Sequence, residues 1–191
     1  TRNIYNDPTQ GEYIYNDFTC SIGINHNPNL YQYKLLYQNF ILITNNILEP
    51  VISIQFKGDF IFGDDLPIFT RKYLGGENLV RGYSPVPYNN PNQVIDKMEN
   101  NNYIYNSIQL QLTCLPKRNY SKIEFGIDGV LFHDYGIGIN KFNGINLSDG
   151  IRGFGFGIRI IASTINYIAI DLGYNPYSLE PMLHLSSYKN F

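Results

Sequence analysis

Apolar and polar residues alternate along most of the segment Val51–Phe62. The apolar positions are Ile52, Ile54, Phe56, Phe60 and Phe62, and the polar positions are Ser53, Gln55, Lys57 and Asp59. Because successive side chains of a β-strand point to opposite faces, this pattern predicts a strand with one apolar face and one polar face. The alternation continues over about ten residues, which is the length that a tilted strand needs to cross a membrane.

Further segments with the same two-residue period predict about eight strands in the chain. The clearest are 103–114, 123–132, 154–160 and 168–173, and weaker candidates are 12–25, 31–43 and 181–191. Turn-forming residues separate the strands, for example at 116–119, and the proline- and asparagine-rich segment 84–102 is predicted to be a long loop. No segment predicts a convincing helix, and no linker indicates a second domain.

The polar faces of these strands carry charged residues, which bears on the choice between two β architectures. These residues are Lys57, Asp59, Glu124, Asp128, Arg159 and Asp171. A soluble β-sandwich would also alternate, but long and closely spaced strands close best into a barrel, which leaves no exposed edge. In lipid that closure is obligatory, because nothing else can pair the edge N–H and C=O groups. The sequence therefore predicts an all-β fold, a transmembrane antiparallel β-barrel.

The composition suits a barrel wall and gives no sign of catalysis. The chain has 191 residues, enough for one substantial domain, and its formal net charge of -2 gives no electrostatic case for a nucleic-acid partner. The 17 Tyr and 12 Phe suit the aromatic girdles of membrane barrels, although an AT-rich genome is an alternative source of the Tyr and Asn. No apolar run approaches the ~18 residues of a spanning helix. Cys20 and Cys114 match no metal spacing, and no phosphate loop or nucleophile motif occurs, so we expect no enzyme activity and no cofactor.

A glycine-rich loop with one arginine lies between two predicted strands. It reads Lys72-Tyr-Leu-Gly-Gly-Glu-Asn-Leu-Val-Arg-Gly-Tyr83. Gly75, Gly76 and Gly82 let the backbone fold tightly. An arginine shielded from water stays charged, so Arg81 requires an acidic or polar partner. We therefore expect this loop to fold into an enclosed polar space.

Four features, which follow one another along the chain in the family's order, resemble the BamA-type superfamily of outer-membrane β-barrels. Residues 1–11 resemble the start of a strand in that family, and 155–159 followed by 170–174 resemble the paired signature near its C-terminus. The chain also stops at an aromatic residue, Phe191, as these barrels typically do. The glycine-rich loop resembles the family's sixth loop, which carries a Val-Arg-Gly-Tyr or Ile-Arg-Gly-Phe motif. The matching residues of that loop are Gly75, Gly76, Val80, Arg81, Gly82 and Tyr83.

The resemblance covers essentially the whole chain and implies a sixteen-stranded barrel, with the sixth loop between strands eleven and twelve. About three predicted strands precede the loop in this chain and about five follow it. Residues 1–191 would then form the C-terminal part of the barrel, the bacterial surface antigen domain, with the periplasmic POTRA domains outside this chain. A complete eight-stranded barrel is the alternative.

The resemblance also implies partners for the charged residues. In the family, the loop arginine pairs with an Asp in a Phe/Gly-x-Asp-x-Gly/Phe motif on strand thirteen. Gly126-Ile-Asp128-Gly-Val130 matches the first and third positions of this motif, and Asp128 lies on the polar face of its strand. We therefore predict that Asp128 is the lumen partner of Arg81. Arg159 and Asp171 are predicted to form a cross-strand pair in the lumen, with pore lining as the alternative role.

In function, the resemblance implies a barrel that assembles or inserts outer-membrane proteins or translocates polypeptides, and that is not an enzyme. Its partners would be membrane lipids, client outer-membrane or secreted polypeptides and accessory assembly subunits, with no nucleic acid. A two-partner secretion translocator is the nearest alternative. Further alternatives are the anchor or exporter of an upstream patatin-type lipase domain, and a passive porin. The bacterial outer membrane is the expected location, with an organelle outer envelope as the alternative.

Overall fold

The computed structural model describes residues 9–23, 29–86, 95–120, 123–140, 142, 145–162 and 165–187. Its strands are β1 (Gly11–Ser21), β2 (Leu30–Leu42), β3 (Val51–Phe62), β4 (Lys72–Tyr73), β5 (Glu99–Asn100), β6 (Asn102–Tyr120), β7 (Ile123–Ile139), β8 (Ile151–Ala162), β9 (Ile165–Asn175) and β10 (Ser178–Ser187). Helical structure in this part of the chain is limited to α1 (Ile95–Met98) and the 3-10 turns η1 (Ile68–Thr70) and η3 (Leu147–Asp149). None of the helices described is long and apolar enough to cross a membrane.

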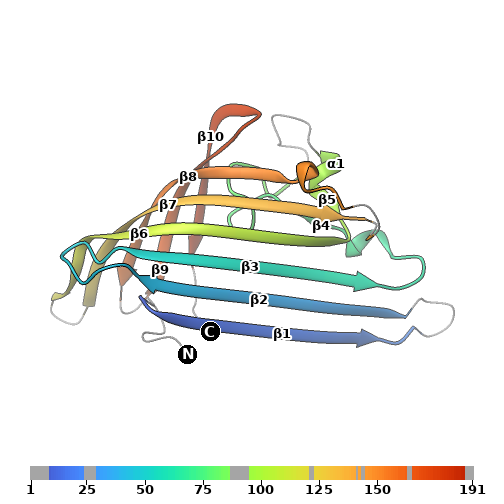
Figure 1. Ribbon diagram of the computed structural model, residues 1–191, viewed down its shortest axis with the longest axis horizontal. Helices are drawn as coiled ribbons and strands as arrows, with labels where there is room; N and C mark the ends of the chain where they lie inside the picture. Colours follow the sequence, from blue (N-terminus) through green and yellow to red (C-terminus); the bar gives the residue numbers. More distant parts are fainter. Residues whose placement is uncertain are drawn as a thin grey trace.

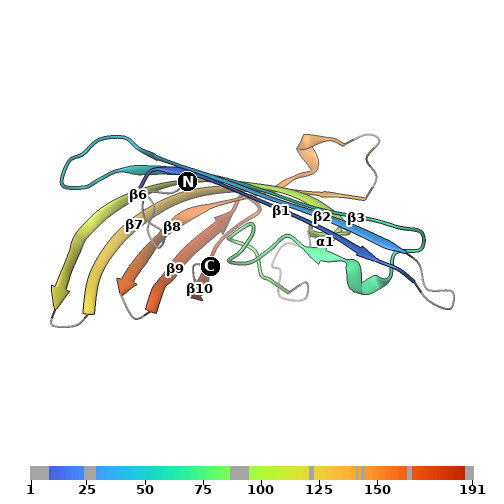
Figure 2. The same ribbon diagram turned by 90° about the horizontal axis from the view of Figure 1, so that it is seen from below.

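Eight strands form one antiparallel sheet in the order β1-β2-β3-β6-β7-β8-β9-β10. The two short strands β4 and β5 pair with each other inside the loop between β3 and β6. The sheet curves into an open trough, and its edges β1 and β10 do not pair with each other within the described residues (Figures 1 and 2). The prediction of an all-β antiparallel fold is confirmed, in the form of a partial barrel whose sheet is not closed.

The two faces of the sheet differ in the way the alternating sequence predicts. In β3, which spans the predicted segment Val51–Phe62, Asp59 is buried on the concave face and lies opposite Lys34 of β2. The convex face carries large apolar side chains that are exposed. Among them are Ile14, Phe18, Ile108, Leu131, Phe154, Phe156, Ile158, Leu183 and Leu185. An outer surface of this kind suits contact with lipid and not with water.

One predicted turn is wrong. Residues 116–119 were expected to end a strand, but β6 continues through them to Tyr120 and pairs with β7. The register shifts between Thr113 and Leu115 and again between Leu115 and Arg118. Such bulges accommodate Pro116, which has no N–H to donate, without ending the strand.

Candidate functional site: a buried arginine between loop and sheet

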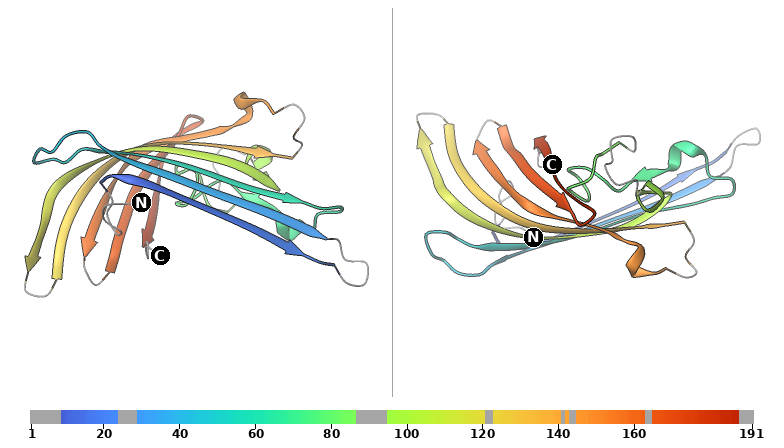
Figure 3. Two further views of the ribbon diagram at one scale, coloured as in Figure 1. Left: turned by 60° about the horizontal axis from the view of Figure 1, so that its bottom comes forward. Right: turned by 90° about the horizontal axis from the view of Figure 1, so that it is seen from above.

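The described part of the loop between β3 and β6 folds back over the concave face of the sheet (Figures 2 and 3). Within the loop, Val80 N–H donates to the carbonyl of Leu74 at 2.9 Å, and Leu74 N–H donates to the carbonyl of Met98 at 3.0 Å. The buried apolar residues that pack together here are Leu74, Val80, Tyr83 and Met98 of the loop, Tyr105 of β6 and Ile151 of β8. The loop therefore has a small apolar core, and this core attaches it to the wall of the sheet.

Two glycines with left-handed backbone angles shape the turn that carries Arg81. Gly76 has a φ of 109° and Gly82 a φ of 93°, which glycine adopts without strain. A Cβ on Gly82 would also lie 2.6 Å from the carbonyl carbon of Tyr174 in β9. Glycine at position 82 therefore permits both the turn and the close approach of the loop backbone to the sheet.

The guanidinium of Arg81 is buried and is held by two carboxylates. Its Nε and Nη2 donate to the two oxygens of Asp134 in β7, at 2.7 and 2.8 Å, and its backbone N–H donates to the same carboxylate at 3.1 Å. Nη1 donates to Asp171 of β9 at 3.0 Å, and Nη2 also donates to Oγ of Ser107 in β6 at 3.3 Å. The ring of Phe132 stacks on the guanidinium, with its centroid 3.5 Å from Cζ. One loop residue thus joins three strands of the wall.

Two arginines and two aspartates balance their charges in this network. Arg159 of β8 forms an ion pair with Asp171, from Nη1 to Oδ1 and from Nη2 to Oδ2, the latter at 3.0 Å. Burial disfavours the charged guanidinium of Arg81, but the hydrogen bonds and the charge of Asp134 outweigh it, so the pKa of Arg81 is raised above its ordinary value. Arg81 therefore stays charged throughout the accessible pH range.

Glycines of the wall make room for the loop backbone. They are Gly136 of β7, Gly153 of β8 and Gly173 of β9. A Cβ on Gly153 would overlap the carbonyl oxygen of Arg81, and one on Gly136 would lie 2.7 Å from Cγ2 of Val80. A Cβ on Gly173 would overlap the backbone nitrogen of Gly82. Because these positions lack side chains, the loop lies directly against the sheet.

The last two strands hold the backbone of the loop motif. Asn175 of β9 donates from Nδ2 to the carbonyl of Gly82 at 2.7 Å. The N–H of Gly82 donates to Nε2 of His184 in β10 at 3.0 Å, and both of these side chains are buried. Sequence reasoning missed them, because a side chain that bonds to a backbone atom leaves no recognisable spacing.

The structure corrects the predicted partner of Arg81. Asp128 is buried on the concave face of β7, but it accepts a hydrogen bond from Nε2 of Gln111 at 2.8 Å and lies opposite Arg159 in the register. The carboxylate that pairs with Arg81 belongs to Asp134, on the same face and about 20 Å further along the strand, at ~3.3 Å per residue. The segment Phe132-His-Asp134-Tyr-Gly136 matches the first, third and fifth positions of the family motif, whereas 126–130 matches two. That fuller match was the signal in the sequence.

The other predicted site residues divide into three groups. Val80 and Tyr83 are fully buried in the core that joins the loop to the wall. Arg159 and Asp171 are brought together on neighbouring strands, and whether they also line a pore stays a prediction. Phe191, and residues 1–8 of the segment 1–11 that resembles the family, lie outside the described residues.

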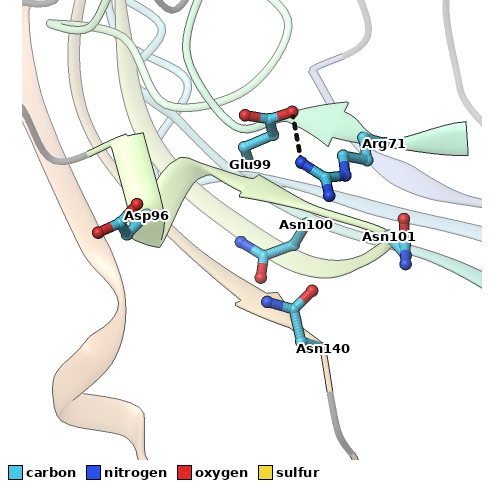
Figure 4. A pocket seen from close by; sticks show the side chains of 6 residues that line it. All are labelled: Arg71, Asp96, Glu99, Asn100, Asn101 and Asn140. Atoms are coloured by element: carbon cyan, nitrogen blue, oxygen red, sulfur yellow. Dashed lines mark hydrogen bonds and ion pairs between the residues drawn. The ribbon is translucent and has the colours of Figure 1, made fainter. Parts of the chain in front are cut away.

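A polar pocket opens at the loop end of the sheet and contains none of the residues that contact Arg81 (Figure 4). It is lined by Arg71, Asp96, Glu99, Asn100, Asn101 and Asn140. Arg71 and Glu99 form an ion pair there at 3.3 Å. In the described part of the chain, no group of three His, Cys, Asp or Glu residues could hold a metal ion.

Changing Asp134 to asparagine is expected to loosen the loop more than the same change at Asp128. The Asp134→Asn change deprives the buried Arg81 of its bidentate partner, a loss of about 3–5 kcal/mol. After Asp128→Asn, the new amide oxygen can still accept from Gln111, so we expect about 1 kcal/mol. Limited proteolysis of the loop in the membrane-embedded protein measures the difference. Equal protease sensitivity of the two variants would contradict the assignment of Asp134.

Comparison with known proteins adds one finding. The family model described as the Omp85 superfamily domain matches residues 1–176 of the chain. No curated protein matches the chain.

Proposed function

The chain belongs to the Omp85 superfamily, and we propose that it forms part of an outer-membrane barrel that inserts other outer-membrane proteins or translocates polypeptides. Members of this superfamily are outer-membrane proteins of bacteria and organelles, and in general they act in protein insertion or translocation and are not enzymes. We further propose that residues 1–191 are the C-terminal part of a sixteen-stranded barrel. The remaining wall strands and the POTRA domains would belong to the same protein.

The docked loop is the observation that supports this proposal best. Arg81 ties the loop to β6, β7 and β9, so the loop occupies the concave side of the sheet. A passive porin needs that space to be open to water, whereas barrels with other functions fill it with loops. In our proposal the docked loop stabilises the wall, and client polypeptides bind at the edge of the sheet.

The edge strand β10 offers a place for a client to bind. Its register with β9 is interrupted between Ser178 and Met182, at Pro181, which cannot donate a backbone hydrogen bond. On its other side, β10 has no partner strand among the described residues. We propose that client strands pair with this edge by β-augmentation, in which main-chain hydrogen bonds supply the affinity.

Depletion of the protein in its own cells tests the proposal. If it inserts barrels, many outer-membrane proteins should disappear from the outer membrane together, and their unfolded forms should accumulate. If it is a two-partner secretion translocator, one exported polypeptide should be lost while the other barrels remain. Quantitative comparison of the outer-membrane and secreted fractions measures both outcomes. No change in either fraction after depletion would refute the proposed function.

A further inference from the structure

The described part of the segment between β7 and β8 lies on the convex side of the sheet, away from the docked loop (Figures 2 and 3). Its described residues are Asn140, Phe142 and Ile145–Gly150. The hydroxyl of Tyr135, on the convex face of β7, donates to the carbonyl of Leu147 at 2.6 Å. Gly150 lies so close to the ring of Tyr135 that a Cβ would overlap it. The turn η3 is therefore fixed against the outer face of the barrel wall.

Phe142 carries this contact across to a strand that is not adjacent to β7. Its ring stacks on Phe62 with centroids 5.5 Å apart and an interplanar angle of 18°, and it lies 6.2 Å from the ring of Phe60. Both belong to the convex face of β3, which β6 separates from β7. Ile137 and Ile139 share the convex parity of Leu131, yet they are almost fully buried, whereas Leu131 is 54% exposed. The outer face at the loop end of β7 is thus covered by protein.

The outer side of this cover carries three large apolar side chains beside the exposed polar residues Asn146, Ser148 and Asp149. Leu147 is 70% exposed, Phe142 47% and Ile145 43%. In a turn that faces water, burying two isoleucines and exposing three large apolar side chains in exchange would gain nothing. Phe142 stacks on Phe62, so these apolar side chains are continuous with the apolar convex face of the sheet. Whatever medium surrounds that face therefore also contacts them.

The polar groups of the turn suit the boundary between lipid and water. The side chain of Asn146 accepts from the backbone N–H of Ser148 at 3.2 Å, and Gly150 N–H donates to the carbonyl of Leu147, so the turn pairs part of its own backbone. Such internal pairing matters where water is scarce. Arg152 is exposed on the convex face of β8 immediately after the turn, where a guanidinium can bind the phosphate of a lipid headgroup.

We propose that Phe142, Ile145 and Leu147 form an interfacial anchor that inserts into the lipid layer beside the loop end of the barrel. The anchor takes lipid acyl chains near their headgroups as its ligand. It holds the wall strands β6, β7 and β8 at a fixed depth in the membrane while polypeptides bind at the edge of the sheet. The inference depends on the barrel spanning the membrane, and not on which polypeptides the protein handles.

A tryptophan placed in the turn tests the anchor. The chain contains no tryptophan, so the Leu147→Trp variant of the full-length protein reports on this position once the spectrum of the unsubstituted protein is subtracted. The protein is reconstituted in phosphatidylcholine–phosphatidylglycerol vesicles that carry bromine either near the headgroup or near the end of the acyl chains. We expect strong quenching by the shallow bromine and weaker quenching by the deep bromine. Ile145→Trp provides a second reporter if the first variant fails to insert.

Two matched positions make the result decisive. Leu131→Trp, in the middle of the same convex face, should be quenched more by the deep bromine, and Asn78→Trp, exposed on the docked loop, by neither. If position 147 behaves like position 78, the anchor does not exist. If it is shielded from water but unquenched by either lipid, it contacts protein, and the lipid assignment is wrong. Because position 131 reports membrane insertion separately, loss of the anchor and failure of the barrel to insert can be told apart.

Discussion

Replacing Arg81 with alanine is expected to release the loop from the concave face and to stop client assembly, while the protein remains in the outer membrane. The change leaves Asp134 and Asp171 buried with Arg159 as the remaining arginine of the network. Removing one partner of a buried ion pair costs about 3–5 kcal/mol. A loss of this size lowers the ratio of docked to released loop by a factor of about 100 or more. The hydrogen bonds between the wall strands are untouched, so the sheet itself should persist.

Three measurements on the same cells check this result: protease sensitivity of the loop, abundance of the protein in the membrane, and the amount of folded client. Arg81→Lys keeps the charge but cannot reproduce the bidentate contact with Asp134, so it should fall between the wild type and the alanine variant. Arg71→Ala is the matched control, because Arg71 is exposed and its pair with Glu99 contributes less than about 1 kcal/mol. Normal client assembly by Arg81→Ala at normal abundance would falsify the role that we assign to the loop.

The wall of this protein could be predicted from its sequence because one physical rule governs it. Alternation with a period of two fixes which side chains face lipid, and β3 begins and ends where the pattern does. The same rule fails at Pro116, where proline predicts a turn although β6 continues through a bulge. Periodicity identifies strands, but it does not show where a register shift lets a strand pass a turn-forming residue.

The site could be predicted only in part, because it depends on how far the loop reaches along the wall. Parity places Asp128 and Asp134 on the same concave face of β7, so it cannot choose between them. What decides is the position at which the loop docks, and this follows from Gly136, Gly153 and the packing of Val80 against them. These contacts join segments far apart in the sequence. A complete match to the motif at 132–136 carried that information, whereas the partial match at 126–130 did not.

The convex turn was not predicted for a similar reason. Phe142 and Leu147 stand in a segment without alternation, so no rule of strand parity applies to them. Their outward orientation follows from contacts with Tyr135 and Phe62, which belong to strands that the sequence separates widely.

Replacing Gly153 with alanine is expected to displace the loop without removing any charge from the network. The new Cβ would overlap the carbonyl oxygen of Arg81, and it would also lie 3.2 Å from Cγ1 of Val80. The carbonyl belongs to the loop backbone, so it cannot yield unless the loop moves. Overpacking of this kind costs about 1–3 kcal/mol and sometimes more. We expect the loop to become protease-sensitive and client assembly to fall, as with Arg81→Ala.

Gly129→Ala in β7 is the matched control for this change. Gly129 also lies within a wall strand, but the nearest atom to its added Cβ is Sγ of Cys114 at 3.2 Å, a single side-chain atom that can shift. That variant should keep a protected loop and normal assembly. The double variant Arg81→Ala, Gly153→Ala then distinguishes a docked loop from two unrelated defects. Once the loop has been released by the loss of Arg81, alanine at position 153 has nothing left to displace, so the two effects should not add. Full additivity in the protease assay would show that Gly153 acts on the sheet itself, and that the loop and the wall are not coupled through this contact.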